Sequence, residues 1–399
     1  MADAAAPASS ETTPGMGAAP PPQPSSAPSG TTAVHAPPPA NGHAGMDNGH
    51  HPQGTTNGHA NDAAANGQSL HQKGRGKIPW SKDVWDRIDQ AVMTEIKRTR
   101  ICARFLPVRM VPPKTTSVPT DSYQASVAGA GVGSILNVDE GATLRLNEYY
   151  VEFEMTPQQV DQEEGDFKQL GHSTAVTLAT KAANVLALAE DLIIFQGQNA
   201  ITGATPFTSN LVQGLGGNKP SDTGLLNFPV GDSAPGAGPL TVAPAPAISV
   251  IEVDPLAPPV GGVIYGSNTF EKVAAAYSQL QATGQYGPYA LVLETVPYAD
   301  AFAPLPATLT LTADRIKPLM TAGFFGSGTL PPNPPPAPAA PYYGVMVSLG
   351  GNTMDLVAGI EPITAFQQED TTGNYRFRVL QRFALRVKDP TAIVILQFN

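Results

Sequence analysis

The sequence predicts an α+β protein, with helices and buried strands in separate stretches of the chain. Residues 287–293 and residues 391–398 are apolar at most positions, which is typical of strands buried on both faces. An amphipathic helix is predicted to begin near Trp85, because apolar residues recur there at three- and four-residue spacing. Strands and helix each need a partner layer, so we expect a large core that includes the last strand.

Residues 1–76 differ in composition from the rest of the chain. They consist almost entirely of Ala, Pro, Gly, Ser, Thr, Asn, Gln and His, and they hold six of the seven histidines, several in a loose Asn-Gly-His repeat. Such a segment buries too little apolar surface to offset the entropy of ordering it. We predict a disordered tail that acts as a solvated spacer, and no metal site, since flexible neighbours fix no coordination geometry.

Charge and cysteine content exclude several classes of protein. The chain has 23 Lys and Arg against 33 Asp and Glu, a formal net charge of −10, and no basic cluster that would bind nucleic acid. The single cysteine, Cys102, excludes an internal disulfide framework, suits a reducing compartment and is expected to be a small core residue. No secretion signal or membrane-spanning apolar run is present. We expect a soluble cytoplasmic protein that binds neither nucleic acid nor membrane.

The first ordered elements are a helix and an arm. Ser81 is the expected N-cap of a helix that runs to about Arg100. One stripe of this helix is apolar: Trp85, Ile88, Val92 and Ile96. Residues 112–147 mix Thr, Ser, Val and Gly, and the glycines at 129–133 lack the spacing of a dinucleotide-binding turn. A long two-stranded arm with a glycine-rich tip fits this stretch better.

The middle of the chain alternates between core and surface segments. Strand alternation shifts phase near Asn147, which predicts a bend or bulge there. The acidic run at 161–166 is expected to be a solvated loop, and residues 172–195 form a wide apolar stripe typical of a core helix. Residues 205–262 are rich in Pro, Gly, Ala and Ser, which indicates a surface excursion, with a strand possible at 247–253.

Two further helices and a basic strand complete the expected elements. The helices are predicted at about 268–283 and 314–322, and residues 375–387 alternate between apolar and polar positions. The polar side of this strand carries four arginines: Arg376, Arg378, Arg382 and Arg386. They could hold a ligand phosphate, but ion pairs with a neighbouring subunit's carboxylates are at least as consistent with a surplus of acid.

No catalytic site is predicted. The sequence has no nucleophile elbow, Walker loop, His-Glu-x-x-His pair or paired cysteines. The ordered part offers one histidine, His172, and one cysteine, neither with a visible partner. We therefore expect no enzyme, no cofactor and no bound metal, and a structural role instead.

Several stretches, taken in order, resemble the shell-forming encapsulin family, also described as linocin-type bacteriocins. They are residues 85–89, 104–108, 189–197, 287–293, 355–359 and 390–396. Together these short stretches are spread over nearly all of residues 78–398. The resemblance implies the Hong Kong 97-type phage capsid fold, in which identical subunits close into an icosahedral compartment.

The resemblance also implies how the chain divides. The expected parts are a disordered tail (1–76), an N-terminal helix (77–111), an extended loop that pairs with a neighbour (112–147), the first part of a peripheral domain (148–261) with an inserted excursion (205–261), an axial domain (262–350) and the closing strands of the peripheral domain (351–399).

Family members enclose enzymes that carry short C-terminal targeting peptides, so the resemblance implies a peptide groove. The positions that match it are Ile101, Arg104, Phe105, Leu106, Val108, Ile360, Glu361, Ile363 and Phe366. The positions that match the lining of the fivefold pore are Ala303, Pro304, Leu305 and Pro306. The implied partners are further copies of the chain and a cargo enzyme such as a ferritin-like protein or peroxidase.

Two other functions remain open. A phage major capsid protein would share the fold, but its DNA predicts a basic lumen that an acidic chain does not offer. A protease or bacteriocin is the weaker alternative, because no catalytic constellation supports it.

Overall fold

The structure is a computed structural model that describes residues 74–127, 134–171, 173–197, 211–215, 223–226, 248–259, 262–304, 310–330 and 342–399. Residues 1–73, the glycine-rich tip expected at 129–133, most of the 205–262 excursion and the proline run at 331–341 lie outside the described residues. Helices and strands both occur, as the α+β prediction requires.

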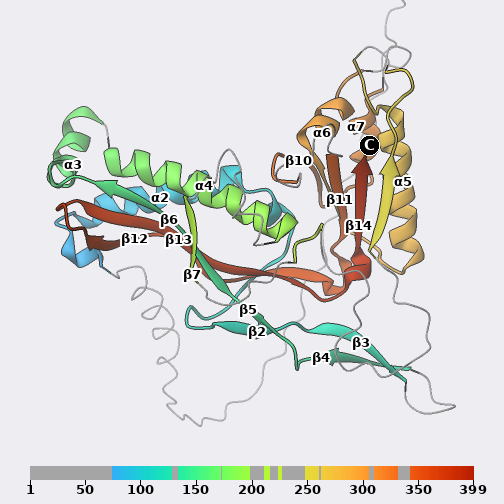
Figure 1. Ribbon diagram of the computed structural model, residues 1–399, viewed down its shortest axis with the longest axis horizontal. Helices are drawn as coiled ribbons and strands as arrows, with labels where there is room; N and C mark the ends of the chain where they lie inside the picture. Colours follow the sequence, from blue (N-terminus) through green and yellow to red (C-terminus); the bar gives the residue numbers. More distant parts are fainter. Residues whose placement is uncertain are drawn as a thin grey trace, which may run out of the picture. The chain divides into compact units, whose positions relative to one another are not determined.

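The first sheet has five strands in the order β1-β12-β13-β6-β7. Their bounds are β1 Val108–Met110, β12 Met354–Glu369, β13 Tyr375–Val387, β6 Asn147–Met155 and β7 Val212–Leu215. All neighbours are antiparallel except β1, which runs parallel to β12 at the edge. The two longest strands of this sheet, β12 and β13, lie side by side (Figure 1).

Two helices cover one face of the first sheet. They are α2, Lys82–Thr99, and α4, Thr174–Gln196; α2 contacts β12, and α4 contacts β6 and β13 (Figure 1). The predicted stripe of α2 is buried, and Ser81 is its N-cap residue by position although its side chain makes no cap hydrogen bond. The second expected core helix is confirmed as α4, whose N-cap Ser173 accepts a hydrogen bond from Val176 N.

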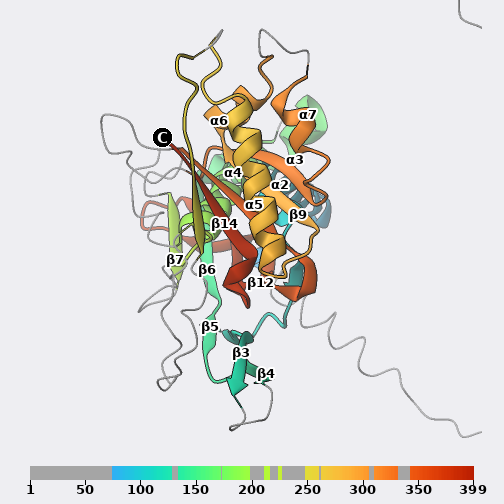
Figure 2. The ribbon, with the colours of Figure 1, turned by 90° about the vertical axis from the view of Figure 1, so that its right-hand side faces the viewer.

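The second sheet also has five strands, in the order β10-β9-β11-β14-β8. Their bounds are β10 Gly323–Ser327, β9 Tyr289–Glu294, β11 Tyr342–Ser348, β14 Ile393–Phe398 and β8 Ser249–Val253. The helices beside it are α5 Ser267–Ala282, α6 Thr295–Ala301 and α7 Thr312–Ile316, and α5 lies along β8 and β14 (Figure 2). Buried side chains of both sheets belong to one continuous apolar cluster.

The arm between α2 and β6 consists of two short ribbons. β2, Ser117–Pro119, pairs with β5, Thr143–Arg145, and β3, Ser122–Val127, pairs with β4, Ser134–Asp139 (Figures 1 and 2). The predicted phase shift near Asn147 is confirmed, because the strand is interrupted at Leu146 between β5 and β6. Short 3-10 turns occur at Arg75–Lys77, Cys102–Arg104, Gly350–Asn352 and Pro390–Ala392.

The acidic run does not lie in a loop. Residues 161–166 belong to helix α3, Pro157–Leu170. Glu163 explains part of the difference, because its carboxylate is buried and accepts hydrogen bonds from Ser173 Oγ and Ala175 N at the start of α4. A carboxylate at a helix N-terminus satisfies free N–H groups and complements the helix dipole. The run therefore contains one buried structural acid, Glu163, as well as the exposed Asp161.

The last strand belongs to the second sheet. β14, which falls within the residues 351–399 expected to close the peripheral domain, pairs with β11 on one side and β8 on the other. Its place between two neighbouring strands fits its apolar pattern, because strands buried on both faces occupy sheet interiors. The expected strand near 247–253 is confirmed as β8, and it too belongs to this sheet.

The arginines of β13 pair within their own chain. Arg376 lies 3.9 Å from Glu154, and Arg378 and Arg382 lie 3.8 and 2.7 Å from Glu148, both carboxylates being on the adjacent strand β6. Antiparallel register places these side chains on one face, where opposite charges attract across the strands. Pairing with a neighbouring subunit is therefore not needed to balance these charges.

Candidate functional site

The candidate site is a groove on the open face of the first sheet, the face opposite α2 and α4. Side chains alternate across β6 and β13, so Tyr149 and Val379 face the helices whereas Tyr150 and Leu380 face away from them. A separate apolar cluster lies on the open face: Tyr150, Ile360, Ile363, Ala365 and Leu380. Four of its members, Ile360, Ile363, Ala365 and Leu380, form the apolar floor of the groove.

Irregular register in β12 shapes the groove. The pairing of β12 with β13 shifts between Ala358 and Ile360 and again between Ile360 and Ile363. Such bulges bend a strand and redirect its side chains. The groove has a volume of about 540 Å³. Its lining residues are Gly74, Lys77, Glu148, Ile360, Ile363, Ala365, Phe366, Gln367, Arg378, Leu380 and Arg382.

The N-terminal rim of the groove is fixed to β12. Arg75 donates from Nε and Nη2 to Thr364 O at 3.1 and 2.6 Å, and its Nη2 lies 2.7 Å from Asp89 of α2. Its guanidinium also lies 4.5 Å from the ring centre of Trp85. Gly74 has a φ of 86°, and a Cβ there would overlap Phe366 O. Only glycine fits this left-handed, close approach without strain.

The charges around the groove are mainly positive. Lys77, Arg378 and Arg382 line it, against one carboxylate, Glu148. Arg382 donates to Glu148 and to Pro113 O, and Arg378 lies 3.8 Å from Glu148 with its Nε buried, whereas Lys77 is exposed. An apolar floor beside an exposed cation suits an extended apolar segment that carries a carboxylate.

The predicted groove positions fall into two groups. Ile360, Ile363 and Phe366 line the groove, and Glu361 is exposed beside them. The earlier positions lie beyond the other end of α2, which has 18 residues and is therefore about 27 Å long.

The positions beyond the end of α2 differ widely in burial. Ile101 is half-buried and donates its N–H to Asp191, and exposed Arg104 donates to Arg98 O. Phe105 and Leu106 are buried in the core, and the ring of Phe105 lies 5.7 Å from that of Phe325. Val108 is 46% exposed on the edge strand β1.

Sequence reasoning missed the charged half of the groove. The signal was present in the alternation of arginines along 375–387 and of Glu148, Glu152 and Glu154 along β6, which pair in antiparallel register. Lys77 and Gly74 could not be found this way, because their position depends on a contact between residues 289 apart, Arg75 and Thr364.

The expected pore positions are described in part. Ala303 is half-buried and Pro304 exposed just after α6, while Leu305 and Pro306 lie outside the described residues. The two described positions carry no charge.

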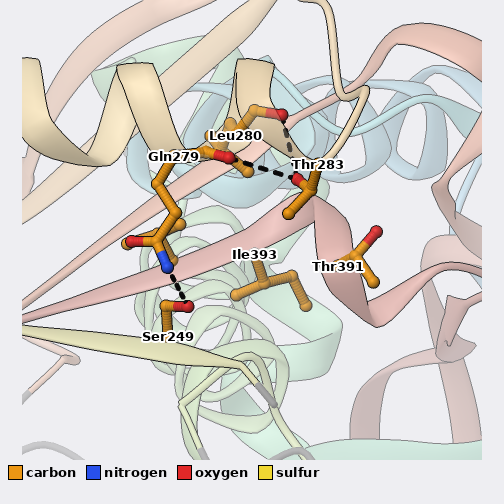
Figure 3. A pocket seen from close by; sticks show the side chains of 7 residues that line it. Ser249, Gln279, Leu280, Thr283, Thr391 and Ile393 are labelled. Atoms are coloured by element: carbon orange, nitrogen blue, oxygen red, sulfur yellow. Dashed lines mark hydrogen bonds between the residues drawn. The ribbon is translucent and has the colours of Figure 1, made fainter. Parts of the chain in front are cut away.

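A second, much smaller pocket lies between α5 and strands β8 and β14. Figure 3 shows Gln279 Nε2 donating to Ser249 Oγ across it, and Thr283 Oγ1 donating to the carbonyls of Gln279 and Leu280. Its volume of about 40 Å³ is close to that of a single water molecule. It is too small for an organic ligand.

Two buried carboxylates lie at the C-terminal end of α4. Burial raises the pKa of Glu190 to about 7, although Arg100, 3.8 Å away, opposes the shift. Burial also raises the pKa of Asp191 to about 6, against the opposing hydrogen bonds from Cys102 N and Ile101 N. Asp191 thereby holds the chain where it leaves α2. No cluster of His, Cys, Asp and Glu in the described segments could hold a metal ion.

The comparisons with known proteins agree with this architecture. The family described as "Encapsulating protein for peroxidase" matches residues 71–223 and 262–384. The type 1 encapsulin shell protein EncA of Myxococcus xanthus (strain DK1622) is 23% identical over 332 residues, which cover 81% of this chain and 96% of that protein. The virus-like particle of Pyrococcus furiosus superposes with a TM-score of 0.50 at 14% identity, covering 78% of this chain and 98% of that one.

The fold is therefore of the Hong Kong 97 capsid type, and the family match defines a shell protein with a structural rather than catalytic role. More specifically, the chain belongs to the encapsulin family, whose profile matches more than half of its length. Throughout the part of the chain that the structure describes, no helix is both long and apolar enough to cross a bilayer.

Proposed function

We propose that copies of this chain assemble into a closed icosahedral shell in the cytoplasm, an encapsulin nanocompartment that encloses enzymes. The observation that carries the proposal is the arm. Its outer ribbon, β3–β4, is two-stranded and pairs with no other described strand. A lone ribbon is marginally stable in water, and its open edges are completed when another copy pairs with them.

The open-face groove is the proposed site for the cargo's C-terminal targeting peptide. Apolar side chains of the peptide would be buried against Ile360, Ile363 and Leu380, as in other grooves that bind extended peptides. The exposed Lys77 would bind an acidic side chain or the terminal carboxylate. A cargo enzyme such as a ferritin-like protein or a peroxidase would be captured in this way.

The uncharged stretch of sequence after α6 is the proposed lining of a pore at the fivefold axis. Ala303, Pro304, Leu305 and Pro306 offer neither charge nor side-chain hydrogen bonds. A ring of such residues admits small neutral solutes without attracting ions.

The assembly test is the size of the purified full chain. We expect a megadalton particle by light scattering and analytical ultracentrifugation, with enzyme cargo identified by mass spectrometry. A species that remains a lone or low-order oligomer in every buffer contradicts the proposal. Nuclease-resistant nucleic acid inside the particles would support a phage-type capsid instead, and hydrolytic turnover by a monomer would support an enzyme.

The cargo test uses a matched pair of charge reversals. Lys77→Glu places a carboxylate in the groove, whereas Lys97→Glu makes the same change on the exposed side of α2. We expect intact particles from both variants and a loss of cargo retention only with Lys77→Glu. Equal retention by the two variants would show that the groove does not bind the targeting peptide.

A further inference from the structure

The arm bends at a defined elbow between its two ribbons. β2 ends at Pro119 and β3 begins at Ser122, so Thr120 and Asp121 connect ribbons that pair with different strands. Asp121 has a φ of 52°, in the left-handed region. Asp is one of the few residues other than glycine that adopts this region, and it does so where the surroundings hold it.

A buried arginine holds this elbow. Arg386 of β13 donates from Nη1 to the Asp121 carboxylate and to Pro119 O, the latter at 3.2 Å. Its other edge donates to both oxygens of Asp355 on β12, from Nε at 2.8 Å and Nη2 at 2.6 Å. The side chain of Arg386 is only 3% exposed. One planar guanidinium therefore connects the arm to two strands of the first sheet with fixed geometry.

Neighbouring contacts extend the same connection. Lys388 Nζ lies 3.0 Å from Asp355 and donates to Asn352 Oδ1 at 2.6 Å. Tyr123, at the start of β3, donates its N–H to Lys388 O at 3.1 Å and its hydroxyl to Gly351 O at 3.2 Å. Two cations, Arg386 and Lys388, balance two carboxylates, Asp355 and Asp121, so the group is internally neutral.

We propose that this Arg386 clamp sets the angle at which the arm leaves the subunit and so determines whether neighbouring subunits close into one uniform particle. The proposal rests on the shell function. Asp121 and Tyr123 lie in the arm, whereas Asp355 and Lys388 lie in or next to strands of the first sheet. Because the clamp joins these two parts, we assign it a role in the geometry of assembly as well as in the stability of the subunit. A buried ion pair contributes little net stability in many proteins, and in some it fixes the orientation of the parts it joins.

The test releases the arm while leaving the buried pair of Arg386 and Asp355 intact. Asp121→Gly removes the carboxylate and relaxes the left-handed backbone requirement. Asp121→Asn keeps an oxygen acceptor and tolerates the same backbone conformation, so it is the conservative variant. Glu140→Gln removes a charge from an exposed position at the same elbow and is the matched control.

Particle size and subunit folding are measured together, by analytical ultracentrifugation, electron microscopy and circular dichroism. For Asp121→Gly we expect native secondary structure and loss of the uniform closed particle, replaced by open or mixed-size assemblies. Glu140→Gln and Asp121→Asn are expected to retain the wild-type particle. Uniform wild-type particles from Asp121→Gly would overturn the proposal.

A second variant covers the case in which Asp121→Gly does not fold. Asp121→Asn combined with Tyr123→Phe weakens the contact with Arg386 and also removes the tyrosine hydroxyl that donates to Gly351 O and Asn352 O, so two contacts of the arm are affected where Asp121→Asn alone affects one. Loss of size uniformity is expected, and wild-type particles from this double variant would also overturn the clamp. If the wild-type chain itself never assembles, the shell function fails and the clamp proposal fails with it, whereas uniform wild-type shells with unaffected variants overturn the clamp alone.

Discussion

Phe105 and Phe366 lie at opposite ends of helix α2. Phe105 packs on Phe325 just beyond the C-terminal end of the helix. The ring centre of Phe366 lies 5.6 Å from that of Phe377, and Phe377 stacks on Trp80, just before the helix begins. The helix between them is about 27 Å long, which corresponds to about eight residues of extended peptide. A single targeting peptide that touched both groups of predicted positions would need at least that length.

Phe105 is expected to stabilise the subunit rather than bind cargo directly. It is 7% exposed within the main core, so Phe105→Ala should lower the free energy of unfolding by about 3–5 kcal/mol. Denaturant unfolding followed by tryptophan fluorescence measures the change. Val108→Ala, at an exposed position, is the control and should change it by less than about 0.5 kcal/mol. A Phe105→Ala subunit as stable as the control would show that this contact is not part of the core.

Glu190 should make stability depend on pH. Its pKa is raised by burial from 4.5 to about 7, so the folded state favours the protonated form. The stability that the protonated group contributes is present below pH 4.5 and is lost as pH rises through about 7. Glu190→Gln removes this titration and should be more stable than wild type above pH 7, by up to about 3 kcal/mol. Thermal melts of both proteins from pH 4 to 8 test this prediction. A stability difference between Glu190→Gln and wild type that does not change with pH contradicts it.

Glu163 should contribute measurably to the start of α4. Glu163→Ala leaves Ser173 Oγ and Ala175 N without their buried acceptor, which should cost about 1–3 kcal/mol. Asp161→Ala, at an exposed position on the same helix, is the matched control. Equal stability of the two variants in denaturant titrations would show that Glu163 is only a surface acid.

Gly74 should tolerate no side chain. Gly74→Ala forces a Cβ into Phe366 O at a left-handed backbone position, so it should cost more than about 1 kcal/mol and loosen the rim of the groove. Gly76→Ala is the control, since a Cβ there meets nothing within 4 Å. Limited proteolysis after Arg75 or Lys77 should be faster in Gly74→Ala alone. Equal cleavage rates in Gly74→Ala and Gly76→Ala would show that Gly74 does not lie close to Phe366 O.

Much of the fold was predictable because local patterns specify it. The stripe from Trp85 to Ile96, the buried strand 289–294 and the alternation along β13 each follow from apolar spacing within one element. The sheet that takes the last strand was not predictable in the same way. The partners of β14 are β8 and β11, and β8 is separated from β14 by more than a hundred residues of sequence.

The groove was predictable only in part. Ile360, Ile363 and Phe366, which line it, were expected from the family resemblance, whereas the positions of Lys77 and Arg378 depend on how β12 bends and where the N-terminal turn meets it. The role of Asp121 was also hidden. A single aspartate in an arm gives no sign in the sequence that a buried arginine more than two hundred residues away holds it.

Cys102 is the only thiol in the chain, and its side chain is fully buried. Burial raises the pKa of this thiol well above its usual range, and the adjacent Asp191 raises it further, so almost no thiolate forms near neutral pH. A maleimide dye or spin probe would therefore not react with Cys102 in the folded subunit. A surface cysteine introduced anywhere on the subunit can be labelled selectively, once per copy, without first removing Cys102.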